Sequence, residues 1–264
     1  LALIVIVSFD LLRFANKWMP FDDRKLMYPK VQVIDEFNKI SGYERIIGNL
    51  GGEATTYYKL PTVGGYDAVY IQRYGEFVKY LEDGKFGQSF RSVVDFPKDG
   101  LYTKEAINLL GIKYVVHKIS DGQVSWTFPY WKYEEGAFKS IYNDGVYEVL
   151  ENTRVFDRAY LVNKYIVEKD QSKILSKMFN NINLKEEIVL EEELNVSLDS
   201  SIGKAQIVGY TPNKVSIKTN SNGNNLLFLS DTFYNGWNAY IDGKKVKILR
   251  SNYTFRSVVV PKGE

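Results

Sequence analysis

The last third of the chain is a succession of short strand patterns separated by polar turns, and this pattern constrains the fold most. The runs cover residues 205–210, 214–219, 226–230, 237–241, 246–249 and 256–260. No helical periodicity interrupts them, and Asp242-Gly243 is a strong tight-turn signal between two of the runs. Strands that follow one another through short turns are typical of a β-sandwich. We therefore predict an antiparallel β-sandwich domain over residues 181–264, with Trp237 in its core.

The middle of the chain mixes helical and strand patterns. Helical spacing of apolar residues or a helix cap marks residues 31–40, 70–81, 104–110 and 170–180, and strand patterns mark 43–47, 112–116 and 159–167. Residues 138–150 read as a hairpin around Asn143-Asp144-Gly145. Residues 48–65 read as a loop, and residues 181–193 are acidic and linker-like. This predicts a mixed α/β layer domain over residues 28–180, and the fold class of the whole chain is α+β.

The chain opens with nine apolar residues, LALIVIVSF. They suit either a buried β-strand or the last turns of a transmembrane helix, although a full span needs about 20 residues. Charged and aromatic residues follow, as expected near a membrane interface, and favour the helix. We predict that residues 1–27 are a membrane-exit segment. The positive charges of Arg13, Lys17, Arg24 and Lys25 are evidence against an outside location, because such charges mark cytoplasmic flanks.

Both ends suggest a piece of a longer protein. Residue 1 is Leu rather than Met, and residues 261–264 read as a turn with no strand after it. We expect the sandwich to lack one strand.

Composition excludes several function classes. A net charge of +2 gives no basic footprint for nucleic acid. The chain has no cysteine and a single histidine, His117, which excludes thiolate chemistry and multi-histidine metal sites. The glycines of residues 48–52 match neither a P-loop nor a dinucleotide motif. We expect no cofactor and no metal. Aromatic residues make up 15% of the chain, which favours β-rich structure first and sugar-stacking surfaces second.

Several segments together resemble one family. The strongest are LLFLSDTFYNGWNAYIDGKKVKI at 226–248 and RSNYTFRSVVVPKGE at 250–264. Weaker ones are Tyr-Pro at 28–29, Arg-Ile-Ile at 45–47, GGYDAVY at 64–70 with Arg-Tyr at 73–74, and LGIKYVV at 110–116. In this order, they resemble the YfhO-like bacterial membrane proteins over most of residues 28–264. The chain departs at Ala68, where Pro is usual, and at Asp157, which precedes Arg158-Ala159 in place of Pro.

The resemblance implies a multispanning protein similar to glycosyltransferases of the GT-C type. Such enzymes transfer a sugar from a polyprenyl-phosphate carrier to a cell-envelope polymer such as lipoteichoic acid. Their catalytic carboxylate lies in an early extracytoplasmic loop of the membrane part, so no catalytic residue is expected in this chain. The chain would be an extracytoplasmic domain that meets the membrane through spans outside it. The alternatives are a non-catalytic carbohydrate-binding or envelope-scaffolding module, and a secreted glycosidase.

Two groups of residues are candidates for ligand contact. Around the paired glycines 64–65, the side chains of Tyr66, Asp67, Arg73 and Tyr74 suit a sugar or a phosphate. The alternative is that Asp67 and Arg73 pair locally. The second group, a carbohydrate platform, consists of Tyr234, Trp237, Tyr240 and Tyr253.

Two further features favour structural roles. His117 ends a predicted strand without marked partners, and Asp22-Asp23 are adjacent carboxylates near the predicted membrane exit. Neither is expected to bind a metal or to take part in catalysis.

Overall fold

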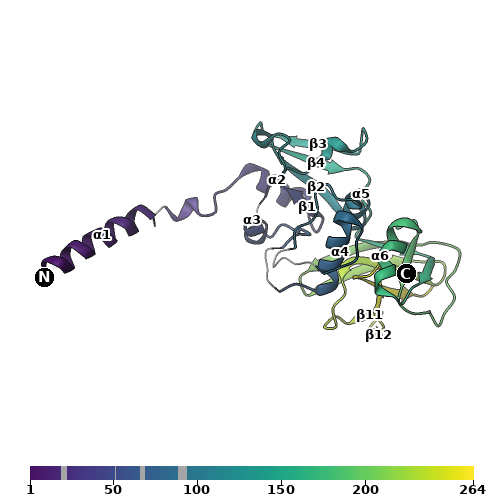
Figure 1. Cartoon of the computed structure of the whole chain (residues 1–264). Helices are drawn as coiled ribbons and strands as arrows, with labels where there is room; N and C mark the ends of the chain where they lie inside the picture. Colours follow the sequence, from purple (N-terminus) through teal and green to yellow (C-terminus); the bar gives the residue numbers. More distant parts are fainter. Residues whose placement is uncertain (19–22, 51, 66–68, 89–93) are drawn as a thin grey trace.

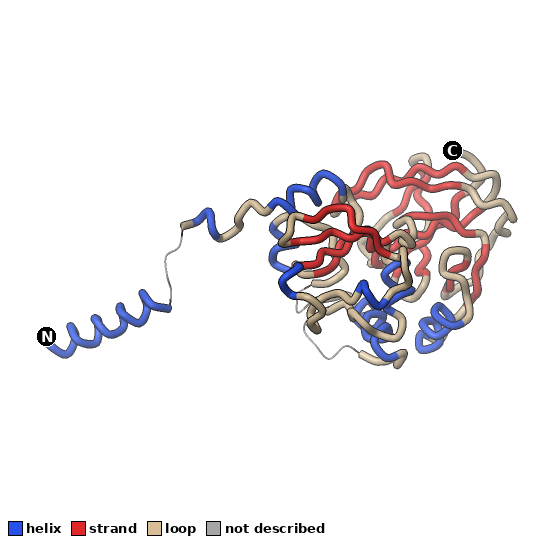
Figure 2. The backbone as a smooth tube through the Cα atoms, turned by 90° about the horizontal axis from the view of Figure 1, so that it is seen from above, coloured by secondary structure: helices blue, strands red, loops and turns tan. Residues whose placement is uncertain are grey.

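The computed structural model of the chain describes residues 1–18, 23–50, 52–65, 69–88 and 94–264. The candidate residues Tyr66 and Asp67, and also Asp22, lie outside the described residues. The fold is mixed α+β, as predicted. Figure 2 shows the strands of two main sheets side by side in the folded part of the molecule, with the first helix outside it.

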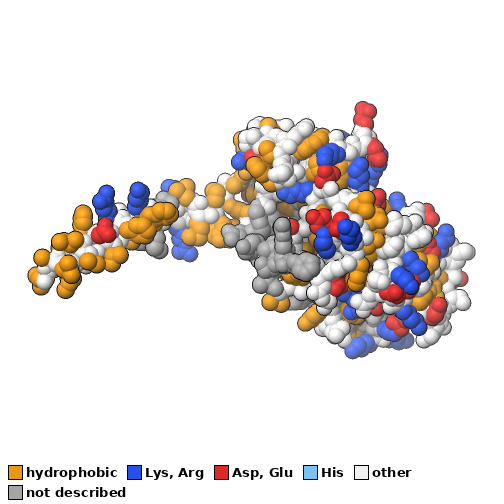
Figure 3. Space-filling view, in the orientation of Figure 1, with side chains coloured by type: hydrophobic (Ala, Val, Ile, Leu, Met, Phe, Trp, Pro, Cys, Tyr) orange, Lys and Arg blue, Asp and Glu red, His pale blue; other side chains and the backbone are white. Residues whose placement is uncertain are grey.

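The N-terminal helix stands apart from the rest of the fold. Helix α1 (Ala2–Trp18) projects away from the folded part (Figure 1) and has no buried residue. Its apolar side chains are exposed along its length (Figure 3). The alternative of a buried strand at residues 1–9 is therefore wrong. In the described part of the chain, no helix combines the length and the apolar character that a membrane span requires.

The first sheet has the strand order β1-β2-β4-β3. Its strands are β1 (Arg45–Gly48), β2 (Ile112–Lys118), β3 (Phe138–Asn143) and β4 (Tyr147–Asn152). β1 and β2 are parallel, while β4 pairs antiparallel with both β2 and β3. Helix α2 (Gln32–Ile40) covers one face, because its buried Val33, Ile34 and Phe37 share a core with β2. Helix α5 (Thr103–Leu109) packs on the opposite face, which makes a layered α/β unit.

The second sheet has six strands in the order β5-β10-β14-β13-β7-β6. They are β5 (Ala159–Val162), β6 (Lys164–Val167), β7 (Glu187–Leu190), β10 (Asn225–Thr232), β13 (Leu249–Ser251) and β14 (Phe255–Val260). β6 and β7 are parallel, so the predicted purely antiparallel sheet is wrong at this edge. The single strand expected at 159–167 is divided at Asn163 into β5 and β6. Because these two outer strands are separated by one residue, the sheet must curl to bring its edges together.

One hairpin covers part of the curled sheet. β8 (Lys204–Thr211) and β9 (Lys214–Asn220) pair antiparallel, and Ile207 packs against Leu161, Leu227 and Leu229 of the sheet. β11 (Ala239–Ile241) and β12 (Lys244–Val246) form a separate ribbon. The predicted turn at Asp242-Gly243 is confirmed, since both residues have positive φ, 49° and 79°. In the β-rich C-terminal part, a two-stranded hairpin thus packs on a six-stranded sheet, whereas a β-sandwich would have two sheets of similar size.

Helices α4 (Gln72–Asp83) and α6 (Gln171–Asn180) pack into a core shared by the two sheets. One hydrophobic core runs through both units, and it includes Phe77 of α4, Ile174 and Met178 of α6, and Phe228 and Phe255 of the second sheet. The domain boundary predicted at residues 180–181 does not follow the sheets, because β5 and β6 precede it and pair with later strands.

Most locally coded elements appear where the sequence predicts them. Asp170 caps α6 by accepting a hydrogen bond from the backbone N–H of Ser172, and the β3–β4 hairpin turns at residues 143–145. Two segments differ. Helix α3 (Gly52–Tyr57) lies within the predicted loop, and β7 lies within the predicted linker, where Ile188, Val189 and Leu190 are buried.

Candidate ligand-binding site

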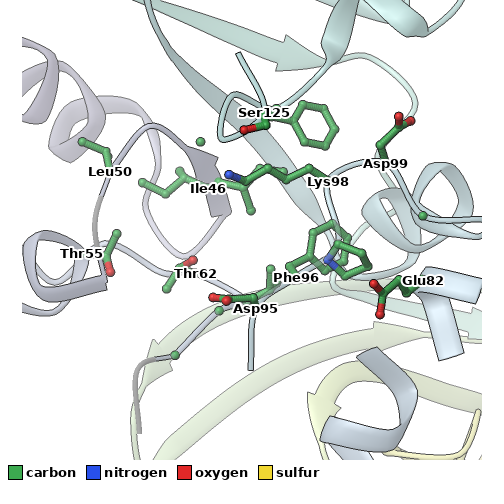
Figure 4. A pocket seen from close by; sticks show the side chains of 18 residues that line it. Ile46, Leu50, Thr55, Thr62, Glu82, Asp95, Phe96, Lys98, Asp99 and Ser125 are labelled. Atoms are coloured by element: carbon green, nitrogen blue, oxygen red, sulfur yellow. The ribbon is translucent and has the colours of Figure 1, made fainter. Parts of the chain in front are cut away.

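A sizeable cavity lies beside the outer strand of the first sheet. It has a volume of about 640 Å³ and is lined by Ile46 and Gly48 of β1, by Gly64 and Gly65, and by the segment 95–100 (Figure 4). β1 leaves this side open because it pairs with β2 on its other edge, apart from one bridge between Ile46 and Thr62. The cavity therefore borders the glycine pair that the sequence marks as a candidate site.

Four charged side chains line this cavity, Lys98 and the carboxylates of Glu82, Asp95 and Asp99. In Figure 4, Lys98 extends across the cavity towards Ile46, and Asp95 points towards Thr62. The Lys98 ammonium donates a hydrogen bond to the backbone carbonyl of Trp126. Burial lowers the pKa of Lys98, and the nearby charge of Asp95 opposes that shift. The cavity thus holds a partly desolvated donor near a carboxylate.

The rest of the lining offers aromatic rings and hydroxyl groups, which can contact a polyhydroxylated ligand. Phe96 presents an aromatic ring, and Thr62 and Ser125 contribute hydroxyl groups (Figure 4). An apolar ring with a few polar groups is a common arrangement in small-molecule pockets. Among the described residues, no group of three or more His, Cys, Asp or Glu is placed to hold a metal ion.

The other two residues of the first candidate group serve the core rather than the cavity. Arg73, at the start of α4, forms an ion pair with Glu191 and donates to the carbonyl oxygen of Tyr253 at 3.1 Å. The Tyr74 hydroxyl donates to the carbonyl oxygen of Val63 at 2.6 Å, and its burial raises its pKa to about 12. The described partner of Arg73 is therefore Glu191. A pairing with Asp67 involves a residue outside the described part.

The predicted carbohydrate platform is not one surface. Tyr234 and Tyr240 are exposed, whereas Tyr253 is only 1% exposed and donates its hydroxyl hydrogen to Glu76. Trp237 is half-buried with the Arg256 guanidinium 4.2 Å from its ring centroid. Tyr253 cannot stack on a sugar because its ring is enclosed by protein. The prediction that Trp237 fills the sandwich core is also wrong, because the preceding turn leaves it under Arg256.

The single histidine, His117, lies inside the fold. It lies on β2, is 7% exposed, and its ring is 5.5 Å from that of Tyr130 in an edge-on contact. Its Nδ1 has no hydrogen-bond partner among the described residues. Asp23 also serves locally, because it accepts a hydrogen bond from the backbone N–H of Lys25.

A buried charge cluster joins the two sheets, and the sequence patterns did not predict it. Asp231 of β10 accepts hydrogen bonds from three guanidinium groups: from Arg45 at 2.8 Å, from Arg158 at 2.5 Å and from Arg256 at 2.9 Å. The Tyr210 hydroxyl also donates to Asp231 at 3.1 Å. All four charged side chains are at most 12% exposed.

The guanidinium groups also control the ionisation of Asp231. Burial alone raises the pKa of this carboxyl, but the positive charges of Arg45, Arg158 and Arg256 lower it by more. The pKa of Asp231 is therefore below its usual value, and the residue is an anion at neutral pH.

The comparisons with known proteins bear on the C-terminal part of the chain. Residues 194–264 match the family model of the bacterial membrane protein YfhO. The match confirms the predicted resemblance over strands β8 to β14. No curated protein and no solved structure matches the chain.

The YfhO-matching part and the preceding part meet at the Asp231 cluster. Asp231 and Arg256 come from the matched part, while Arg45 and Arg158 come from the segments before it. Arg45 also donates to the carbonyl oxygen of Leu110 at 2.6 Å. Four of the YfhO-like segments quoted from the sequence thus meet in one network. The family resemblance marks these residues in the sequence. Local patterns do not, because the four charged residues lie far apart along the chain.

Gly111 is part of the same arrangement. Its φ is +65°, a left-handed conformation that glycine adopts without strain, and it ends α5. A Cβ atom at this position would lie 2.5 Å from Cγ of Arg158. Gly111 therefore provides both the turn into β2 and the space for the Arg158 stem.

Proposed function

We propose that this chain is the extracytoplasmic domain of a YfhO-type, glycosyltransferase-like membrane protein. The membrane part would transfer a sugar from a polyprenyl-phosphate carrier to a cell-envelope polymer, and it would carry the catalytic carboxylate. The domain described here would hold the acceptor glycan or the lipid-linked sugar in the cavity beside β1.

The exposed apolar surface of α1 is the observation that carries the membrane assignment. Eleven large apolar residues between Leu1 and Trp18 are at least 49% exposed, and no residue of the helix is buried. Apolar surface of this extent marks contact with a membrane or another protein. Arg13 and Lys17 lie towards its C-terminal end, next to Phe14 and Trp18, a composition suited to an interface. The YfhO match supports the membrane as the partner.

The cavity beside β1 supports a role in holding sugar. It combines two aromatic rings, hydroxyl groups, three carboxylates and an ammonium group on a wall with paired glycines. Sugars offer both an apolar ring face and many hydroxyl groups, so a pocket of this type can contact both. The same features support the second candidate function, a carbohydrate-binding or scaffolding module without catalysis.

A cavity-blocking variant tests the proposal. Ser125 is exposed at the cavity wall, so Ser125→Trp should fill the entrance without disturbing the core. Ser120→Trp is a matched control, because Ser120 is also exposed and does not line the cavity. In cells that carry the parent protein, we expect Ser125→Trp to reduce the sugar content of the envelope polymer, and Ser120→Trp to leave it unchanged.

Binding by the purified chain separates the two candidate functions. A transferase domain predicts that Ser125→Trp lowers both glycan binding and polymer glycosylation. A non-catalytic module predicts lower binding with unchanged glycosylation. If Ser125→Trp changes neither quantity, the cavity is not a glycan site.

A further inference from the structure

A second, smaller cavity of about 170 Å³ adjoins the Asp231 cluster. It shares Thr62 and Val63 with the wall of the large cavity. Its polar lining consists of the Arg45 guanidinium and the hydroxyl groups of Thr62, Tyr74, Ser230 and Thr232. The described lining includes no carboxylate side chain. The cavity is therefore rich in hydrogen-bond donors and has a positive wall.

The cluster behind this wall has an excess of positive charge. One carboxylate, Asp231, contacts three guanidinium groups, which leaves two positive charges unbalanced by direct contact among the described residues. Glu44 also feels the charges of Arg158 and Arg45, but the charge of Lys113 acts on it more strongly. Unbalanced charge in a buried site is costly.

Aromatic rings compensate two of the three guanidinium groups. Arg158 lies 4.3 Å from the ring centroid of Tyr210, and Arg256 lies 4.2 Å from that of Trp237. Arg45 has no such ring contact among the described residues. It is also the member of the cluster that lines the small cavity. The guanidinium group without a ring contact is thus the one that lines the cavity.

The hydrogen bonds of Arg45 leave donors for a ligand. Its Nη1 donates to the carbonyl oxygens of Leu110 and Ser230 and to the Ser230 hydroxyl, and its Nη2 donates to Asp231. Its Nε–H and a second Nη2 hydrogen have no acceptor among the described residues. The Thr232 hydroxyl likewise shows no partner there, whereas the Tyr74 hydroxyl already donates to Val63.

We propose that this cavity binds a phosphate-class oxyanion, either as a free ion or as a phosphate monoester. Arg45 would supply charge and a pair of N–H donors, and the hydroxyl groups of Thr232 and Ser230 would supply further hydrogen bonds. A water molecule occupies about 30 Å³ of liquid volume, so the cavity has room for a tetrahedral oxyanion and some water. This inference does not depend on the proposed glycan function, which concerns the larger cavity.

Titration of the purified chain with inorganic phosphate tests the site directly. At constant ionic strength, phosphate should bind and raise the thermal unfolding temperature, whereas chloride should do neither. Thr232→Val keeps the shape of the side chain and removes its hydroxyl, and we expect it to weaken phosphate binding about tenfold. Thr219→Val on β9 lies outside the cavity and should leave binding unchanged. Arg45→Lys should weaken binding further, if circular dichroism shows that it folds.

Vesicles distinguish the two sources of phosphate. Binding to phosphatidylcholine vesicles that contain phosphatidic acid, with loss in Thr232→Val, indicates a lipid phosphomonoester. Binding of inorganic phosphate without vesicle binding indicates a free ion. The proposal is wrong if phosphate has no effect beyond that of chloride, or if Thr232→Val binds phosphate as tightly as the unchanged chain does.

Discussion

At the residue scale, Asp231 links the two sheets because its carboxylate is the shared acceptor of Arg45, Arg158 and Arg256. None of these residues is unusual by itself in the sequence. Their meeting depends on contacts between positions up to 186 residues apart. Local patterns cannot reveal such a site, whereas a family resemblance can mark its members without saying what they do.

Removing the Asp231 charge should destabilise the fold strongly at neutral pH. Asp231→Asn leaves three guanidinium groups without their anion, and we expect a loss of about 3–5 kcal/mol in the free energy of unfolding. Asp242→Asn, in an exposed turn, is the control and should have little effect. Urea unfolding at pH 7 measures both variants.

The same comparison has a predicted pH dependence. The pKa of Asp231 is lowered in the folded state, so its contribution is complete above the unfolded value of about 3.9. That contribution is lost as the pH falls through the folded pKa. The difference in stability between the unchanged chain and Asp231→Asn should therefore shrink below about pH 4. An equal difference at pH 7 and at low pH would contradict the assigned role of the carboxylate.

Gly111 gives a second residue-scale prediction. Gly111→Ala requires a left-handed alanine, which costs about 1–2 kcal/mol, and it also forces the Arg158 stem to move. Gly136→Ala is a matched control, because Gly136 has a φ of +77° and open space around its Cβ position. We expect Gly111→Ala to be the more destabilising variant in thermal unfolding. Equal losses would show that Arg158 moves without cost.

At the scale of elements, the sequence predicts structure well where the signal is local. Helix α6 begins at the cap Asp170, and the β3–β4 hairpin turns at Asp144-Gly145. The prediction of one strand over 159–167 is wrong. The strand pattern of the sequence continues through Asn163, whereas the chain there passes from β5 at one edge of the curled sheet to β6 at the other. Strand pairing is a long-range property, so the pattern showed β structure but not its partners.

Strand β7 depends on one side chain outside the strand. Oδ1 of Asn252 accepts the backbone N–H of Val189 at 2.8 Å, and Asn252 itself has a φ of +44°. Asn252→Ala should lose about 1–3 kcal/mol for the unpaired N–H. It should lose a further 1–2 kcal/mol, roughly, for the left-handed backbone.

Asn252→Gly separates the two contributions. Glycine accepts the left-handed backbone but still leaves the Val189 N–H without its acceptor, so this variant should lie between the unchanged chain and Asn252→Ala in urea unfolding. If Asn252→Gly and Asn252→Ala are equally unstable, backbone strain contributes nothing at this position.

At the scale of the whole molecule, α1 and the folded part differ in what their surfaces can contact. The folded part encloses a continuous core, whereas α1 buries nothing and exposes apolar side chains along its length (Figure 3). From the sequence, the α+β class and the β-rich C-terminal part were predictable. The cavity beside β1 was only partly so, because Gly64 and Gly65 line it while Arg73 and Tyr74 turn out to support the core.

The claim that the folded part faces the outside of the cell is tested most directly by cysteine labelling in intact cells. The chain has no cysteine, so a single introduced thiol is the only label site within it. Ser197 is exposed and Ser251 is fully buried, which makes Ser197→Cys the reporter and Ser251→Cys its control. We predict that a membrane-impermeant maleimide labels Ser197→Cys in intact cells that carry the parent protein and leaves Ser251→Cys unlabelled. Labelling of Ser197→Cys only after lysis would place the domain in the cytoplasm and contradict the proposed function.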